Sequence, residues 1–87
     1  MVYLSHIRKK EVVHMLGTRI AALRRRAGLS QSELARRLRI SPSAVGMYEQ
    51  GRREPAADTL VRLAEIFSVS TDYLLGRTDD PSVPKRT

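Results

Sequence analysis

Side chains suited to hold an anion or to hydrogen-bond a polar surface gather between Ser41 and Arg53. Arg52 and Arg53 are adjacent, and a guanidinium group offers phosphate a planar fork of N–H donors. Ser43 has a hydroxyl that can donate or accept a hydrogen bond, and Met47 adds an apolar side chain four residues later. These residue types favour non-covalent recognition of a charged and polar partner.

The residues that most catalytic and metal sites need are absent or poorly placed. The chain has no cysteine, and its only histidines, His6 and His14, lie near the N-terminus. No metal pair or histidine-based triad can therefore form in the rest of the chain. The sequence also has no glycine-rich phosphate loop. We expect no enzymatic activity and no cofactor.

The charge balance points to an anionic partner. The 87 residues, enough for one domain, include 16 Lys and Arg against 9 Asp and Glu, for a formal net charge of +7. Such an excess favours nucleic acid over a membrane, and a merely soluble basic surface is the alternative. No apolar run approaches the roughly 18 residues of a spanning helix, and no signal peptide is evident. We therefore expect a cytoplasmic protein that does not bind membranes.

The patterning divides the chain into three zones. Residues 1–14 are basic and poorly patterned, whereas residues 15–78 are dense in helix start and stop signals. Residues 79–87 hold two prolines and almost nothing apolar, which predicts a disordered tail. The domain is therefore expected to span residues 15–78.

Two interpretations of residues 1–14 stay open. The codons possible for Lys10-Glu11-Val12 include a stretch that resembles a bacterial ribosome-binding site just before Met15. The segment is then either a mis-assigned leader or a genuine N-terminal extension. In the second case it is expected to form an extra helix that includes Ile7, Val12 and Val13.

The middle zone predicts five short helices and no strand. Each helix is bounded by residues that favour its start or its end, and apolar residues recur along it at helical spacing. Because aromatic residues make up only 5% of the chain, the core is expected to be aliphatic. The first predicted helix has an apolar stripe of Leu16, Ile20, Leu23 and Ala27 and ends at Gly28, and the second is capped by Ser30 with Glu33. The third begins at Ser41 and Pro42 and ends at Gly51, and the fourth begins at Pro55. The fifth, Thr71–Leu75, is capped by Ser70 and ended by Gly76.

The second and third predicted helices have the properties of a helix-turn-helix. Ala35 is small enough to let the next helix pack closely, and Ile40 is apolar in the turn. Val45 and Tyr48 supply the inner side of the following helix. The second helix of such a pair can lie in the DNA major groove, about 12 Å wide, while the first crosses the backbone.

Three blocks of sequence strengthen this interpretation. LRRRAGLSQSELA (23–35), ISPSAVGMYEQG (40–51) and VSTDYLLG (69–76) together resemble the Xre family of Cro/C1-type regulators. The resemblance implies an all-α, compact five-helix lambda-repressor-like bundle. It also implies a sequence-specific transcriptional regulator, a repressor, that acts as a homodimer on double-stranded DNA. Its third helix, at about residues 42–50, would enter the major groove of a palindromic operator.

The resemblance also assigns roles to individual residues. Base contacts are implied for Gln31, Pro42, Ser43, Ala44 and Met47. Phosphate contacts are implied for Gln31, Arg37, Ser41, Gln50, Arg52 and Arg53. Arg24 and Glu49 match an ion pair between the first and third helices, which either orients the recognition helix or, as we favour, holds the fold together. Because the third helix carries few long polar side chains, we expect sparse direct readout of bases.

Several positions leave alternatives open. Arg39 stands where the family often has glycine, and we interpret it as a solvated residue that a left-handed conformation would strain. Gly46 either allows close approach to the groove floor or is simply tolerated inside the helix. Most remaining arginines, Arg19 among them, are expected on a solvated face, with Arg36 or Arg37 near phosphate.

Partner choice is the last open point. The same fold could serve as an adaptor whose main contact is another protein, although the positive charge near the motif favours DNA. Tyr73, Leu74 and Leu75 are more apolar residues than a short last helix can bury, which is consistent with a homodimer.

Overall fold

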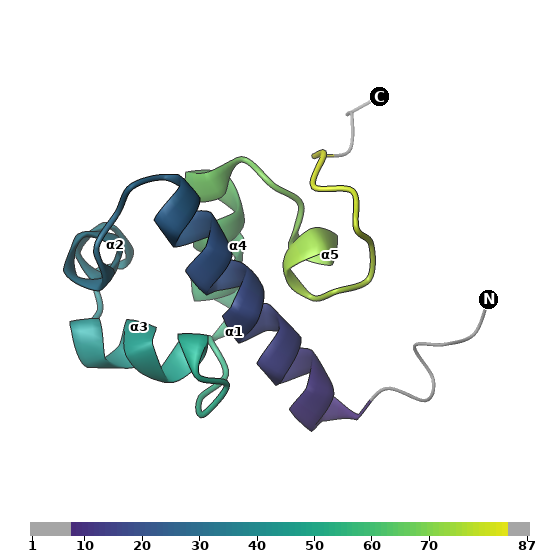
Figure 1. Ribbon diagram of the computed structural model, residues 1–87, viewed down its shortest axis with the longest axis horizontal. Coiled ribbons are helices and arrows are strands. Elements are labelled where there is room, and N and C mark those ends of the chain that lie inside the picture. Colours follow the sequence, from purple (N-terminus) through teal and green to yellow (C-terminus); the bar gives the residue numbers. More distant parts are fainter. Residues whose placement is uncertain (1–7, 84–87) are drawn as a thin grey trace.

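The computed structural model describes residues 8–83, and five α-helices account for its regular structure (Figure 1). They are α1 (Lys9–Arg26), α2 (Gln31–Leu38), α3 (Pro42–Glu49), α4 (Ala57–Phe67) and α5 (Thr71–Leu74). Residues 8–83 contain no strand, so the all-α prediction is confirmed. None of these helices is long and apolar enough to cross a lipid bilayer.

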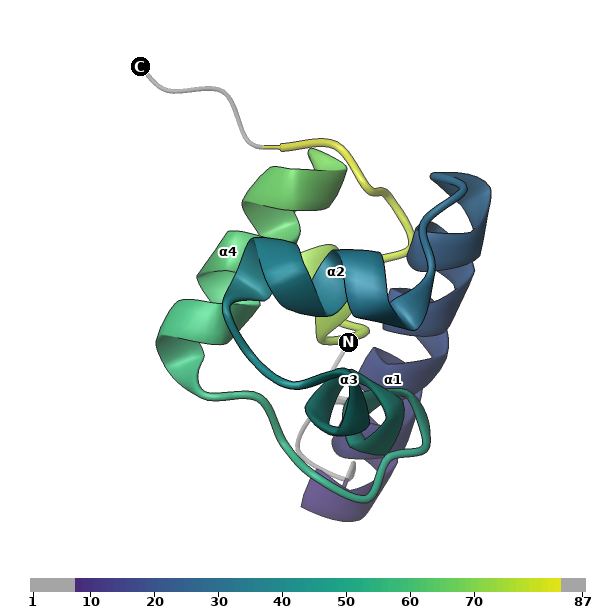
Figure 2. The ribbon, with the colours of Figure 1, turned by 90° about the vertical axis from the view of Figure 1, so that its left-hand side faces the viewer.

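The long helix α1 runs diagonally through the molecule, with the other helices around it (Figure 1). α2 and α3 lie on one side of it, and α5 lies on the opposite side. Turning the view by 90° brings α2 and α3 to the front, where α2 now lies across the view and α3 is seen along its axis (Figure 2). The two helices therefore cross steeply, and α3 packs against both α1 and α2.

Serine caps place the starts of three helices where the sequence predicts them. Ser30 accepts a hydrogen bond from the backbone N–H of Glu33, whose carboxylate accepts one from the Ser30 N–H, completing a capping box. Ser41 caps α3, with Pro42 in its first turn, and Ser70 caps α5. These bonds satisfy N–H groups that have no partner within the helix.

Other helix limits differ from the prediction. α1 begins at Lys9, so the expected boundary between residues 14 and 15 falls inside a continuous helix. Ala27 is the exposed C-cap of α1 and lies outside its buried stripe. α4 begins at Ala57, with Ala56 as its N-cap, so the buried Pro55 that was expected to open it lies two residues before the helix. Of the proposed extension, Ile7 lies outside the described residues, and Val12 and Val13 belong to α1.

The core is aliphatic, as expected, and draws on every helix. Its fully buried side chains are Ile20, Leu34, Val45, Leu63 and Leu74. Tyr48 is the one aromatic residue among the buried side chains of the described chain. Because Leu74 is completely buried in the monomer, the idea that it is left exposed for dimerisation is wrong.

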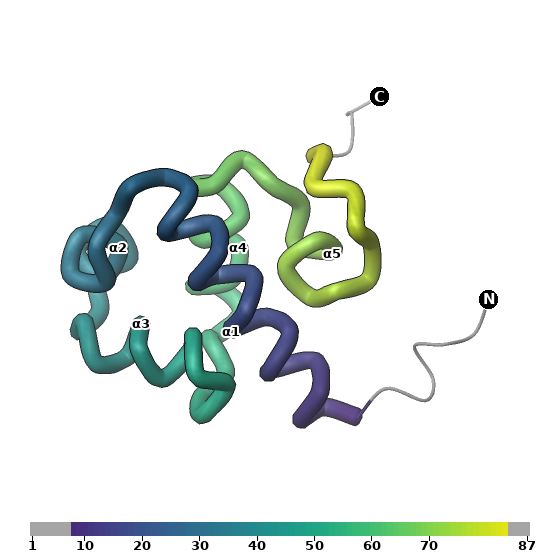
Figure 3. The backbone as a smooth tube through the Cα atoms, in the orientation of Figure 1, coloured from purple at the N-terminus to yellow at the C-terminus, as the bar shows by residue number. Residues whose placement is uncertain are grey.

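The segment after α5 is attached to the domain. The tube in Figure 3 shows it passing beside α5. The backbone N–H of Ser70 donates to the Pro81 carbonyl at 3.0 Å. The Arg19 guanidinium donates to the Tyr73 carbonyl, to the Thr78 carbonyl at 2.7 Å and to the Asp79 carboxylate at 2.7 Å. Residues 79–83, which the sequence predicts to be disordered, are thus hydrogen-bonded to the domain at Asp79 and Pro81. Arg19 is a partly buried anchor and not the solvated residue that was expected.

Candidate nucleic-acid interface

A three-residue turn, Arg39–Ser41, joins α2 to α3 and sets their relative orientation. Arg39 adopts a left-handed conformation with φ 58°, and its side chain is exposed. Ile40 packs against the core, and its backbone N–H donates to the Ala35 carbonyl at 3.0 Å. Ala35 is only 1% exposed, and its small side chain lets the two helices pack closely. The turn is therefore held by the packing of Ile40 and by its backbone hydrogen bond to α2.

A glycine lets α3 approach α1. A Cβ atom placed on Gly17 would lie 2.8 Å from the carbonyl oxygen of Glu49 and closer still to that of Tyr48. Both oxygens belong to the backbone of α3, which cannot move aside as a side chain can. This role of Gly17 was not predicted from the sequence, although an isolated glycine inside a helical stripe is a signal for close packing.

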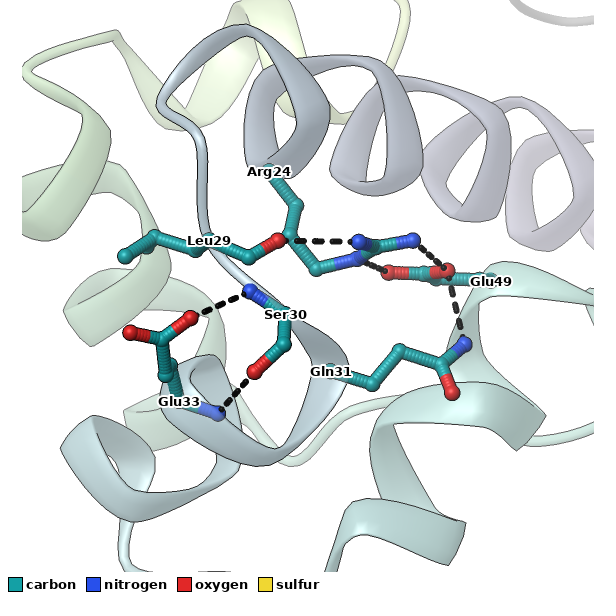
Figure 4. Close-up of polar contacts among 6 residues, drawn as sticks. All are labelled: Arg24, Leu29, Ser30, Gln31, Glu33 and Glu49. Carbon is teal, nitrogen blue, oxygen red and sulfur yellow. Dashed lines mark hydrogen bonds and ion pairs between the residues drawn. The ribbon is translucent and has the colours of Figure 1, made fainter.

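The same helices are joined by an ion pair between Arg24 of α1 and Glu49 of α3 (Figure 4). Arg24 Nε donates to Glu49 Oε2 at 2.6 Å, and Nη2 donates to Oε1 at 3.0 Å. A third donor of the guanidinium, Nη1, binds the Leu29 carbonyl at 3.0 Å. The two side chains are 12% and 7% exposed, so solvent screens this forked pair poorly.

The surroundings of Glu49 keep its carboxylate charged. Burial raises its pKa, but hydrogen bonds from Arg24 and Gln31 and the charges of Arg24 and Arg25 outweigh that effect. The pKa of Glu49 is therefore lowered from its ordinary 4.5. The hydrogen bond to Glu49 likewise raises the pKa of Arg24.

Gln31, at the first position of α2, is tied into this network. Its Nε2 donates to Glu49 Oε1 at 3.1 Å (Figure 4). A Cβ on Gly46 would meet the Gln31 amide at 3.8 Å, so this exposed amide lies over the middle of α3. The contact between Gln31 and Glu49 was not predicted, and it pre-positions a side chain with both donor and acceptor groups.

The outer face of α3 carries most of the expected base-contacting residues. Pro42, Ser43 and Met47 are exposed, and Met47 is one of the few large apolar side chains exposed in the described chain. Ser41 is also exposed, and although its oxygen caps α3, its O–H can still donate to a phosphate. These residues share the surface on which the Gln31 amide lies.

Ala44 is the exception. Its methyl group is 6% exposed and belongs to the buried core cluster with Val45 and Tyr48. The expectation that Ala44 meets a base is therefore not supported by its position. Gly46, in contrast, is half-buried with room for a methyl group, so packing inside the protein does not require glycine there.

Exposed cationic residues occur on α2 and on the segment after α3. Arg37 is exposed on α2, as is Arg36. Gln50, Arg52 and Arg53 are exposed where the chain leaves α3, and Arg52 Nη1 lies 3.5 Å from Gln50 Oε1. The exposed face of α3 is therefore accompanied by positive charge on the helix before it and on the segment after it.

Comparisons with known proteins agree with this architecture. The family described as helix-turn-helix matches residues 20–74. The chain belongs to the helix-turn-helix family of Xre, or Cro/C1, type. It is 42% identical over 64 residues to the transcriptional regulator ImmR of Bacillus subtilis, a match that covers 74% of this chain and 50% of ImmR. This helix-turn-helix chain thus spans about half the length of that relative.

Two solved structures have the same fold. The P22 c2 repressor, crystallised with a synthetic operator, aligns with a TM-score of 0.66 at 30% identity, covering 69% of this chain and 91% of that one. The restriction-modification controller protein C.AhdI from Aeromonas hydrophila aligns with a TM-score of 0.65 at 31% identity, over 71% of this chain and 94% of that one. The predicted lambda-repressor-like bundle is confirmed.

Proposed function

We propose that this chain is a sequence-specific transcriptional regulator that binds double-stranded DNA with α3 in the major groove. The observation that carries the proposal is the exposed face of Ser43 and Met47, which a steep crossing with α2 and a buried ion pair hold rigidly. Helices held this way can present side chains to base edges while their flanks bind phosphates.

Within the proposed complex, contacts divide into two kinds. Gln31, Pro42, Ser43 and Met47 face the bases, with Gln31 able to offer both a donor and an acceptor. Arg37, Ser41, Gln50, Arg52 and Arg53 hold the backbone on either side, and Gln31 also lies near it. Because only Gln31 and Ser43 among these residues carry hydrogen-bonding side chains, DNA shape contributes much of the specificity.

The proposal extends to a homodimer that represses from a palindromic operator. Two copies would place their α3 helices about 34 Å apart, one turn of DNA, so that each reads one half-site. Support comes from the family resemblance and from Tyr73 and Leu75, which are only half-buried in the monomer. The cytoplasm is the compartment where such a regulator meets its operator.

Selection from a pool of randomised duplexes tests this function directly. We expect enrichment of one motif with two related half-sites, bound at least a thousand-fold more tightly than a shuffled duplex, which is about the lower end for specific DNA-binding proteins. Affinity should also fall steeply as salt rises from 50 to 200 mM, because phosphate contacts release counterions. Binding without enrichment of a DNA motif, or an affinity that does not change with salt concentration, would contradict the proposal and favour a protein partner instead.

A further inference from the structure

The first turns of α1 lie against the segment that follows α3. A Cβ on Gly51 would be 3.2 Å from the Cα of His14, so the two backbones are in close contact. Lys9 Nζ forms an ion pair with Glu54 Oε1 at 3.1 Å. In both Figure 1 and Figure 2 the start of α1 lies at the same edge of the molecule as α3 and the segment after it.

This contact creates a shallow groove of about 400 Å³ with a strongly positive wall. Its charged lining consists of four cations and one carboxylate: Lys9, Lys10, Arg52, Arg53 and Glu54. Because Lys9 already pairs with Glu54, that carboxylate opposes an incoming anion less than a free one would. The wall therefore carries three more positive than negative charges.

Lys10 has a particular place on this surface. It lines the groove beside Arg52 and Arg53, and it also lines a second groove of about 690 Å³ beside Gln50 and Gly51. Lys10 is exposed and lines both grooves together with proposed phosphate-binding residues. The part of the chain that matches the helix-turn-helix family begins only at residue 20, so Lys10 lies before it.

We propose that Lys10 is a further phosphate-binding residue, which continues the track of Gln50, Arg52 and Arg53 onto the first turns of α1. The inference rests on the proposed DNA binding and adds a contact to it. A lysine ammonium is a compact charge that binds phosphate without demanding one orientation, which suits a contact at the rim. The close packing of His14 against Gly51 holds the first turns of α1, which carry Lys10, beside the segment after α3.

The test uses the full chain and the duplex recovered by selection. Dissociation constants are measured by fluorescence anisotropy between 50 and 200 mM salt for the unmodified protein and for Lys10→Gln, Lys10→Arg and Arg62→Gln. Arg62 is an exposed arginine of α4 that lines neither groove, so its variant removes the same charge elsewhere. Thermal melting monitored by circular dichroism confirms that each variant is folded.

We expect Lys10→Gln to lower the steepness of log K against log salt by about 0.9, the value for one lost phosphate contact. Affinity for selected and shuffled duplexes should fall by the same factor, because a phosphate contact carries no sequence information. Lys10→Arg should keep the original slope. A Lys10→Gln slope equal to that of Arg62→Gln would overturn the inference while leaving the proposed function intact. Failure of the unmodified protein to bind any duplex would refute the proposed function, and this contact with it.

Discussion

Gly17 of α1 and Glu49 of α3 are in backbone contact, so close that a Cβ on Gly17 would lie 2.8 Å from the Glu49 carbonyl oxygen. The same Glu49 receives both donors of the Arg24 fork through its side chain. α3 is therefore held to α1 by its backbone and by its side chain at one residue. The outer face of α3 depends on this attachment for its orientation.

Two glycine substitutions separate packing from helix propensity. Gly17→Ala should destabilise the protein by about 1–3 kcal/mol because the new methyl group meets backbone that cannot yield. Gly46→Ala should instead stabilise it by about 0.5–1 kcal/mol, since its methyl group has room and alanine favours a helix. Urea unfolding of the two variants shows whether each substitution raises or lowers the free energy of unfolding. Equal stability of the two variants would mean that the α1–α3 contact is looser than described.

Removing one partner of the buried ion pair should cost more than removing both. We expect Glu49→Ala to destabilise the fold by about 3–5 kcal/mol, because Arg24 is left charged and without its partner in a poorly hydrated place. The double variant Arg24→Met with Glu49→Met should lose less than Glu49→Ala alone. Glu65→Ala, at an exposed glutamate of α4, serves as the control. A Glu49→Ala protein that melts normally but no longer binds DNA would show that the pair acts in recognition and not in folding.

Acid should weaken the fold partly through Glu49. Its pKa in the folded protein lies below the ordinary 4.5, so the folded state binds fewer protons than the unfolded state between the two values. The resulting stabilisation is complete above about pH 5 and is lost as the pH falls through the folded pKa. The pKa values of Glu33 and Asp80 are lowered as well, through hydrogen bonds from Ser30 and Ser82, and add to the same trend.

Comparison with Glu49→Gln isolates the contribution of Glu49 to this trend. The difference in unfolding free energy between the two proteins should be largest near neutral pH and shrink toward pH 3. Guanidinium titrations at several pH values measure it. If this difference in unfolding free energy stays constant from pH 7 to pH 3, the pKa of Glu49 is not lowered by folding.

Arg19 should control the attachment of the chain after α5. Its side chain is 17% exposed, and the guanidinium group lies 4.1 Å from the centre of the Tyr73 ring and donates to the carbonyls of Tyr73 and Thr78. Arg19→Ala should therefore cost about 1.5–3 kcal/mol, the range for hydrogen bonds to a charged group. Amide hydrogen exchange should accelerate at Ser70, whose N–H is held by Pro81. Arg62→Ala is the matched control, and exchange that is equally slow in both variants would contradict this role.

The features that were predictable from sequence are the local ones. Ser30 and Glu33 identify a helix start because the capping box depends on residues three apart. Gly17 and Arg19 were missed because their partners lie on other helices, and helical spacing does not say what a helix face contacts. Ala44 was assigned to the wrong face, although it lies four residues before the inward-facing Tyr48 and should share its side of the helix.

The most direct test of the account is an NMR titration of the full chain with the selected duplex. If α3 enters the major groove, amide shifts should concentrate at Gln31, Ser43, Met47 and the segment 50–53, and Lys10 should shift with them. Residues of α4 such as Val61 and Arg62 should change little. Shifts centred on α4 and α5 with an unperturbed α3 would contradict the account.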